Sequence, residues 1–157
     1  MAVIFLGTRN RPEVSSSNKY YISKHRFYEL KHFCLQYREW SSKCDIYKES
    51  IRSSSLIQVN KDITVQDPTG DIFASIEELY TKMQMVKNVC KLADEQLSSY
   101  IFEAVTKDRS FAYLQTVLEI PCSRSTFYDR YRKFYYILSN LRKWRLRNKN
   151  TSLNESL

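Results

Sequence analysis

The fold is decided by the stretch SFAYLQTVLEIPCSRSTFYDRYRKFYYIL, residues Ser110–Leu138. Ser110 and Ser123 are favourable helix N-caps, and apolar residues follow each of them. Pro121 lies between the two segments and ends the first, because a proline cannot continue a helix and its predecessor is pushed toward an extended conformation. We therefore predict a helix of about nine residues, a turn of about four residues and a second, longer helix.

The longer helix carries its apolar residues at helical spacing. They recur at steps of four, three, four and three: Phe127, Tyr131, Phe134, Leu138 and Leu141. This pattern predicts one buried face on a helix that continues to Arg147. Asp94 can cap an earlier supporting helix, so residues 94–148 are expected to form a helix-turn-helix bundle, with a tail at 149–157.

Glycine is scarce in this chain. Gly7 and Gly70 are the only glycines among 157 residues, where average usage near 7% would give about eleven. Sheet proteins and phosphate-binding loops use glycine at turns and close backbone approaches, so its scarcity favours helices joined by short polar turns. Since 43% of the residues are hydrophobic, an all-α protein with its own core is expected.

The N-terminal half predicts a long helical hairpin at residues 19–93, preceded by a flexible arm at 1–18. A first helix is expected over Ser23–Lys48 and a linker over 50–70, ending in the turn DPTG (Asp67–Gly70). The second helix repeats apolar residues for about three heptads: Ile72, Ile76, Leu79, Met83, Val86 and Cys90. Its partner is either the first helix or the same helix of a second copy, which would make a homodimer through the long helices.

Positive charge is concentrated at one end of the chain. The formal net charge is +8, but residues 1–120 hold 16 basic and 15 acidic side chains. Residues 121–157 hold nine basic and two acidic side chains, a net charge of +7. A short basic helical segment is typical of a protein that binds a polyanion, because neutralising phosphates releases condensed counterions.

The helix-turn-helix pattern places the start of its second helix in the DNA major groove. Arg124, Tyr128 and Arg132 lie four residues apart on the side away from the apolar face. Arg124 is expected to contact a guanine, Arg132 a phosphate, and the serines beside the helix start a phosphate. The expected DNA-binding residues are Ser123, Arg124, Ser125, Tyr128, Asp129, Arg132, Lys133, Arg142, Lys143 and Arg145.

Two other interpretations compete with binding of double-stranded DNA. The row of Arg124, Tyr128 and Arg132 is also what the solvated face of an ordinary helix looks like. Alternatively, the chain is a small protein that binds and inhibits or redirects a host protein, such as RNA polymerase or a defence nuclease. The first predicted helix favours this second interpretation, because Phe33, Trp40 and several tyrosines exceed what one partner helix can cover.

The segment IPCSRSTFYDRYRKFYYILSNLRK (Ile120–Lys143) resembles the C-terminal part of small phage and prophage proteins of Gram-positive bacteria, of the RinA and ArpU type of late transcriptional regulators. KHRFYELKHFCLQYREW (Lys24–Trp40) and the DPTG turn are similar to their N-terminal half and central linker. The resemblance implies a helix-turn-helix like region 4 of bacterial sigma factors and a role in controlling phage gene expression. The arm Ala2–Val14 and the basic segment Arg142–Lys149 have no counterpart in it.

Enzymatic and metal-binding functions are not expected. His25 and His32 both lie on the first predicted helix, without a matching nucleophile or a second ligand pair, and no glycine-rich phosphate loop is present. The four cysteines form no CxxC pair and are predicted to be buried or half-buried thiols: Cys34, Cys44, Cys90 and Cys122. No cofactor, metal or membrane span is expected, and the predicted location is the cytoplasm of a bacterial host cell.

Overall fold

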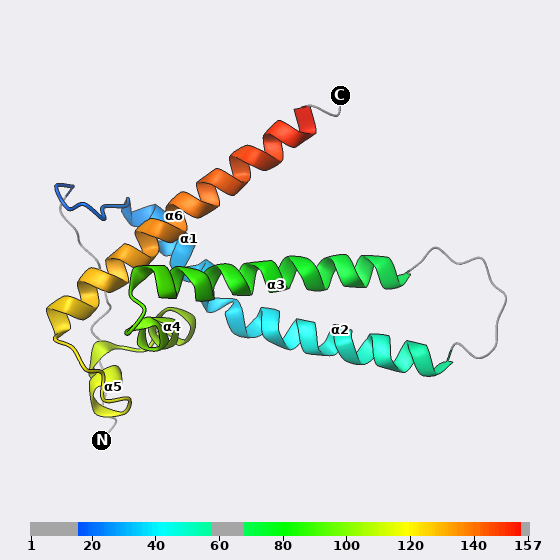
Figure 1. The fold of residues 1–157 in the computed structure, drawn as a ribbon, viewed down its shortest axis with the longest axis horizontal. Coiled ribbons are helices and arrows are strands. Elements are labelled where there is room, and N and C mark those ends of the chain that lie inside the picture. Colours follow the sequence, from blue (N-terminus) through cyan, green and yellow to red (C-terminus); the bar gives the residue numbers. More distant parts are fainter. Residues whose placement is uncertain (1–15, 58–67, 155–157) are drawn as a thin grey trace, which may run out of the picture. The chain divides into compact units, whose positions relative to one another are not determined.

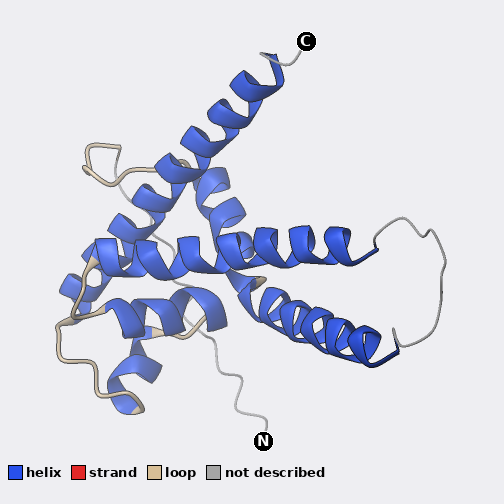
Figure 2. Ribbon diagram, turned by 45° about the vertical axis from the view of Figure 1, so that its right-hand side comes forward, coloured by secondary structure: helices blue, strands red, loops and turns tan. Residues whose placement is uncertain are grey.

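The computed structural model describes residues 16–57 and 68–154, with side chains over 16–53 and 70–145. These residues form six α-helices joined by loops, with no strand among them (Figures 1 and 2). The helices are α1 (Lys24–Leu35), α2 (Tyr37–Ile57), α3 (Pro68–Ala93), α4 (Ser98–Lys107), α5 (Phe111–Thr116) and α6 (Arg124–Asn154). The predicted all-α class is confirmed. The predictions for residues 1–15, for 58–67 of the central linker and for 155–157 of the tail lie outside the described residues. The described parts of the predicted linker and tail are helical instead, since α2 continues to Ile57, α3 begins at Pro68 and α6 continues to Asn154.

The described chain divides into two compact units. Gln36–Met85, which holds α2 and most of α3, is one unit, and the residues before and after it form the other. The prediction of a single helix over Ser23–Lys48 is wrong. In the structure α1 ends at Leu35 and a separate helix, α2, begins at Tyr37. The two halves bury their apolar residues in different units, so the first part of the predicted hairpin belongs to the larger unit instead.

The larger unit is built around α6. Helix α1 packs on α4 and α6, and α4 packs on α5 and α6. Four residues of the predicted stripe are buried as expected, and Leu141 is half-buried: Phe127, Tyr131, Phe134 and Leu138. Tyr135, which lies outside that stripe, is also buried, and its ring packs 4.7 Å from that of Phe27 on α1. Helix α6 is therefore covered on two adjoining sides.

Two buried phenols lie within this core. The hydroxyls of Tyr131 and Tyr135 are 3.5 Å apart, and the two rings meet edge to face at 5.0 Å. Burial raises the pKa of both phenols, and the hydrogen bond between them opposes this rise for Tyr131. Burial likewise raises the pKa of the Cys90 thiol to about 12 and that of Cys34 further. All four groups are uncharged in the folded protein near neutral pH.

The connection between α5 and α6 is longer than predicted. Ser110 caps α5 as expected, its hydroxyl accepting the N–H of Tyr113, but the helix has six residues and ends at Thr116. The backbone turns earlier than the proline because Glu119 adopts a left-handed conformation, with φ of 51°. The N–H of Ile120 then donates to the carbonyl of Leu114 at 3.0 Å, which closes the turn. The connection covers residues 117–123, so the predicted four-residue turn is wrong.

Helix α4 ends in a second left-handed residue, Asp108, with φ of 52°. Its carboxylate forms an ion pair with Lys31 of α1, with 2.8 Å between Lys31 Nζ and Asp108 Oδ1. Glycine is the residue that usually occupies such positions. This chain uses aspartate and glutamate instead, and at Asp108 the ion pair between two helices offsets part of the conformational cost.

The smaller unit contains α2 and the first part of α3. Trp40, Cys44 and Met83 are buried in it, and Lys82 Nζ lies 6.0 Å from the centre of the Trp40 ring. The sequence predicts Gly70 in a turn before the helix, and this prediction is wrong, because Gly70 lies within the first turn of α3. The helix starts at Pro68 because proline at the first helical position has the required φ and lacks an N–H that the helix would leave unpaired.

We expect Glu119→Gly to stabilise the protein. A non-glycine residue in the left-handed region destabilises the folded state by roughly 1 kcal/mol. Glycine removes this strain, but its greater freedom in the unfolded chain cancels part of the gain. The free energy of unfolding, measured by urea titration, should rise by about 0.5 kcal/mol. Glu119→Ala is the control and should give no increase, since alanine keeps the Cβ. A Gly variant less stable than the Ala variant would contradict the assignment.

Stability should fall at alkaline pH. Above about pH 10 the unfolded chain loses phenolic protons that Tyr131 and Tyr135 keep in the folded state. Fewer protons are then bound to the unfolded state, so the free energy of unfolding falls by up to about 1.4 kcal/mol per pH unit for each phenol. Urea midpoints measured from neutral pH to about pH 12 test this. The double variant Tyr131→Phe with Tyr135→Phe should show a shallower decline, and an unchanged slope would contradict the prediction.

Candidate nucleic-acid interface

The start of α6 is exposed while the opposite side of the same turn is buried. Phe127 is fully buried, and its ring packs 5.5 Å from that of Phe111 on α5. Ser123, Arg124, Ser125 and Thr126 are all exposed. The aromatic contact between α5 and α6 therefore fixes which residues of the first turn reach solvent.

The hydroxyls at this helix start are already hydrogen-bonded to one another. Ser123 caps α6 as predicted, since its Oγ accepts the N–H of Thr126 at 3.3 Å. The same oxygen lies 3.0 Å from Ser125 Oγ and 2.9 Å from Thr126 Oγ1. These three hydroxyls form one small exposed cluster, so an anion at the helix start would compete with these contacts.

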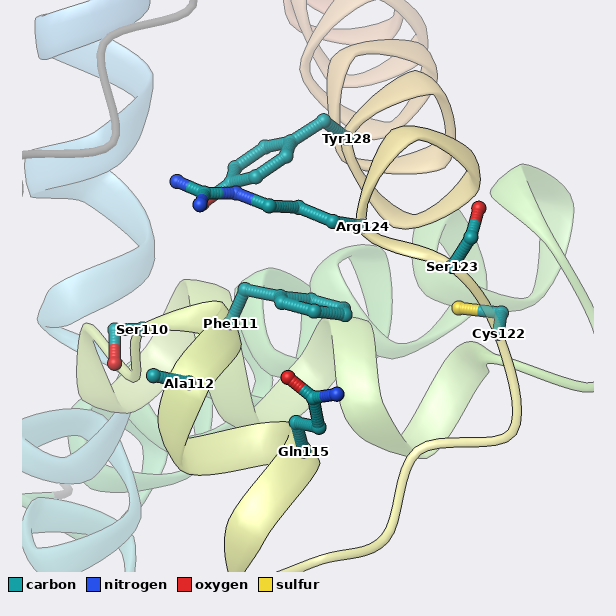
Figure 3. Close-up of a pocket in the computed structure, with 8 residues that line it drawn as sticks. All are labelled: Ser110, Phe111, Ala112, Gln115, Cys122, Ser123, Arg124 and Tyr128. Carbon is teal, nitrogen blue, oxygen red and sulfur yellow. The ribbon is translucent and has the colours of Figure 1, made fainter.

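Arg124 and Tyr128 lie over an open cavity of about 280 Å³ between α5 and α6. The guanidinium carbon of Arg124 is 5.7 Å from the centre of the Tyr128 ring, and Figure 3 shows the two side chains side by side. The cavity is lined by Ser110, Phe111, Ala112, Gln115, Cys122, Ser123, Arg124 and Tyr128. Burial, followed by the charge of Asp94, raises the pKa of the Cys122 thiol, so this wall of the cavity is uncharged at neutral pH.

Asp129 forms an ion pair within the protein. Arg130 Nη1 donates to Asp129 Oδ2 at 3.3 Å, and Arg130 Nε donates to Asp94 Oδ2 at 3.0 Å. The other oxygen of Asp94 accepts the N–H of Leu97 at 3.0 Å, so one carboxylate holds both the turn before α4 and the side of α6. The predicted cap at Asp94 is wrong, because α4 begins at Ser98 with Leu97 at the N-cap position and no side-chain cap. The sequence also gives no sign of the contact between Asp94 and Arg130, 36 residues away.

Arg132 and Lys133 are half-buried, unlike Arg124. The Nε atom of Arg132 is buried and has no hydrogen-bond partner among the described residues. The predicted row of Arg124, Tyr128 and Arg132 is thus exposed at its beginning and partly covered two turns later.

Arg142 of α6 contacts two side chains of α1 and so helps to pack the two helices together. Its guanidinium carbon is 4.0 Å from the centre of the Phe33 ring, and its Nη1 is 3.9 Å from Glu29 Oε1. Burial lowers the pKa of Arg142, and Arg26 lowers it further while Glu29 opposes the change. Lys143 and Arg145, in contrast, are exposed.

Sequence reasoning missed a second contact between these two helices. Arg26 on α1 donates from Nε to Ser139 Oγ at 3.0 Å and from Nη2 to the Ser139 carbonyl at 3.2 Å. Its Nη1 also donates to both carboxylate oxygens of Glu29 at 2.7 Å. Ser139 is buried, so this arginine gives its hydroxyl a charged hydrogen-bond donor within the α1–α6 contact.

The predicted site residues therefore form three groups on one helix. Ser123, Arg124, Ser125 and Tyr128 come together at its start. Asp129, Arg132, Lys133 and Arg142 are paired or half-buried along its middle. Lys143 and Arg145 are exposed beyond it, next to Trp144, which is 61% exposed.

The predicted buried or half-buried state of the cysteines is confirmed: Cys34, Cys44 and Cys90 are buried, Cys122 is half-buried, and all four are free thiols. Within the described ranges, no three His, Cys, Asp or Glu side chains are grouped as metal ligands would be. A helix with the length and apolar character needed to cross a membrane is likewise absent from 16–57 and 68–154. No protein-family model, curated protein or solved structure matches this chain.

Among the predicted site residues, Arg142 should behave as a structural residue. Arg142→Ala removes the cation from the Phe33 ring and uncovers part of that ring, so it should lower the free energy of unfolding by about 1–2 kcal/mol. Lys143→Ala removes the same charge from an exposed neighbour and should change stability by less than about 0.5 kcal/mol. Urea denaturation of both variants measures the difference, and equal stabilities would contradict it.

Proposed function

We propose that this protein binds double-stranded DNA in a sequence-specific manner, with the start of α6 in the major groove. The observation that carries the proposal is the exposed first turn of α6, held by a buried aromatic face against α4 and α5. This is how a recognition helix is presented in helix-turn-helix proteins: one helix supports it from behind, and its N-terminal residues face the bases. The resemblance to phage late regulators extends the proposal to control of phage transcription.

Arg124 is the residue assigned to base contact. It is exposed at the first helical position of α6, and the Tyr128 ring beside it restricts where its guanidinium can lie. An arginine held in this way can donate two parallel hydrogen bonds to O6 and N7 of a guanine, the commonest specific contact in the major groove. The partly covered Arg132 has less freedom to reach a base.

Lys143 and Arg145 are assigned to the phosphate backbone. Arg145 lies 21 residues after Arg124 on the same helix, or about 32 Å at 1.5 Å per residue. A straight helix of that length cannot keep both ends in one curving groove, so the second basic group meets the sugar-phosphate chain. Phosphate contacts of this kind add affinity without sequence preference.

The competing hypothesis, that this chain binds and inhibits or redirects a host protein, has less support. It depended on the aromatic rings of the first predicted helix. Trp40 is buried, and Arg142 covers one face of Phe33, so neither ring offers a large open surface.

Binding to a duplex selected from a random-sequence pool, measured by fluorescence anisotropy, tests the proposal. Arg124→Ala should lower affinity for the selected duplex by about 1–3 kcal/mol and remove much of its advantage over an unrelated duplex. Arg145→Ala should weaken binding to both duplexes equally and reduce the slope of log affinity against log salt by about one.

Lys91→Ala is the matched control, because it removes one charge from an exposed side chain of α3. It should leave the sequence preference and its salt dependence as in the wild type. If the pool yields no preferred duplex, or if Arg124→Ala keeps the full preference, sequence-specific binding through α6 is wrong.

A further inference from the structure

The open cavity between α5 and α6 has one charged residue in its lining. Arg124 is the only charged side chain among the eight that line it. In the described part of the chain no carboxylate pairs with this guanidinium, which lies beside the Tyr128 ring. The rest of the polar lining is uncharged: hydroxyls, the Gln115 amide and the Cys122 thiol. A negative charge that enters the cavity therefore meets one cation and no acidic residue in the lining.

Aromatic rings form the apolar part of the cavity. Phe111 and Gln115 of α5 lie on one side of it, and Arg124 and Tyr128 of α6 lie on the other (Figure 3). The Tyr128 ring is 5.4 Å from the ring of Phe127 and 6.3 Å from that of Phe111. Because these contacts hold the rings in place, the aromatic surface exists before any ligand binds.

The cavity has room for one ring with a small substituent. Its volume is about 280 Å³, whereas cavities of about 150 Å³ in other proteins bind benzene. A guanidinium donates two parallel hydrogen bonds to a carboxylate. One cation matches one negative charge, so a carboxylate suits this lining better than a phosphate dianion does.

We propose that this cavity binds a small aromatic carboxylate, with the ring against Phe111 and the carboxylate paired with Arg124. The charges behind the lining set this direction. Burial, followed by the charge of Asp94, raises the pKa of the Cys122 thiol, although Arg130 pairs with Asp94 at 3.0 Å. Negative charge is therefore disfavoured at the Cys122 end, so the ring takes that end and the carboxylate takes the Arg124 end.

A ligand held in this way competes with DNA. Arg124 is the residue assigned to a guanine, and a guanidinium paired with a carboxylate cannot donate the same hydrogen bonds to O6 and N7 of the base. The effect is reciprocal, since a bound duplex weakens the binding of the acid by the same factor. This competition rests on the proposed function, whereas binding of the acid to the cavity does not.

Cys122 reports the occupancy of the cavity without DNA. It is half-buried in the lining, whereas the other three cysteines are buried. Alkylation of Cys122 in the full chain by N-ethylmaleimide, an uncharged reagent, is followed by mass spectrometry of its peptide, with sodium benzoate as the probe and constant ionic strength. Benzoate at ten times its dissociation constant should slow this reaction about tenfold, since only the empty cavity exposes the thiol.

Two comparisons separate the charge of the probe from its ring. Benzamide has the same ring without the charge and should bind at least about tenfold more weakly than benzoate. Arg124→Ala should raise the benzoate dissociation constant by about the same factor. Lys91→Ala is the matched control, because it removes an exposed cation that is not in the cavity lining, and it should leave that constant unchanged.

Competition is measured with the duplex selected from the random pool. Benzoate at ten times its dissociation constant should weaken duplex binding about tenfold, and sodium chloride at the same ionic strength should not. Alkylation of Cys122 that benzoate does not slow, or equal protection by benzamide, would overturn the proposal. A bound benzoate that leaves duplex affinity unchanged would show that the two ligands do not share Arg124. Failure to select any duplex removes the proposed function alone, because the alkylation measurement involves no DNA.

Discussion

Burial of one side of α6 is the constraint on which the larger unit depends. Phe127, Tyr131, Phe134 and Leu138 occupy one side of this helix, and Tyr135 extends the buried surface toward α1. Rings of this size lose a large contact area if the helix rotates, so the rotation of α6 about its axis is fixed. Once it is fixed, the side of the first turn that carries Arg124 must face solvent. The candidate interface is therefore a consequence of the core.

Basic residues have two different uses in this protein. Arg26, Arg130 and Arg142 connect helices: they satisfy a buried serine, hold the turn before α4 and cover an aromatic ring. Arg124, Lys143 and Arg145 are exposed, and the ring that Arg124 lies beside, Tyr128, belongs to its own helix. The +7 charge of residues 121–157 thus overstates the charge offered to a partner, because part of it is neutralised or packed within the protein.

Helical periodicity predicted what depends on neighbouring residues. The buried stripe of α6, the caps at Ser110 and Ser123 and the helical class all follow from local spacing and side-chain chemistry, and all are present. Some errors arose where distant contacts decide. The break at Gln36 separates helices that belong to different units. The early end of α5 is a local error: Glu119 adopts a left-handed conformation before Pro121, at a position where residue type favours glycine. The pairing of Arg130 with Asp94 joins residues 36 positions apart, which local spacing cannot reveal.

By itself, the sequence determined that the chain is helical, where the main buried stripe of α6 lies and where the positive charge is concentrated. Each of these three follows from residue type or from the repeat of the helix, and none depends on a distant partner. The tertiary structure decided which basic side chains remain available. Arg142 and Lys143 are adjacent and carry the same charge, yet the first packs on Phe33 and the second faces water. The reason is that α1 crosses α6 on one side only, and a sequence does not show which side its neighbour will cover.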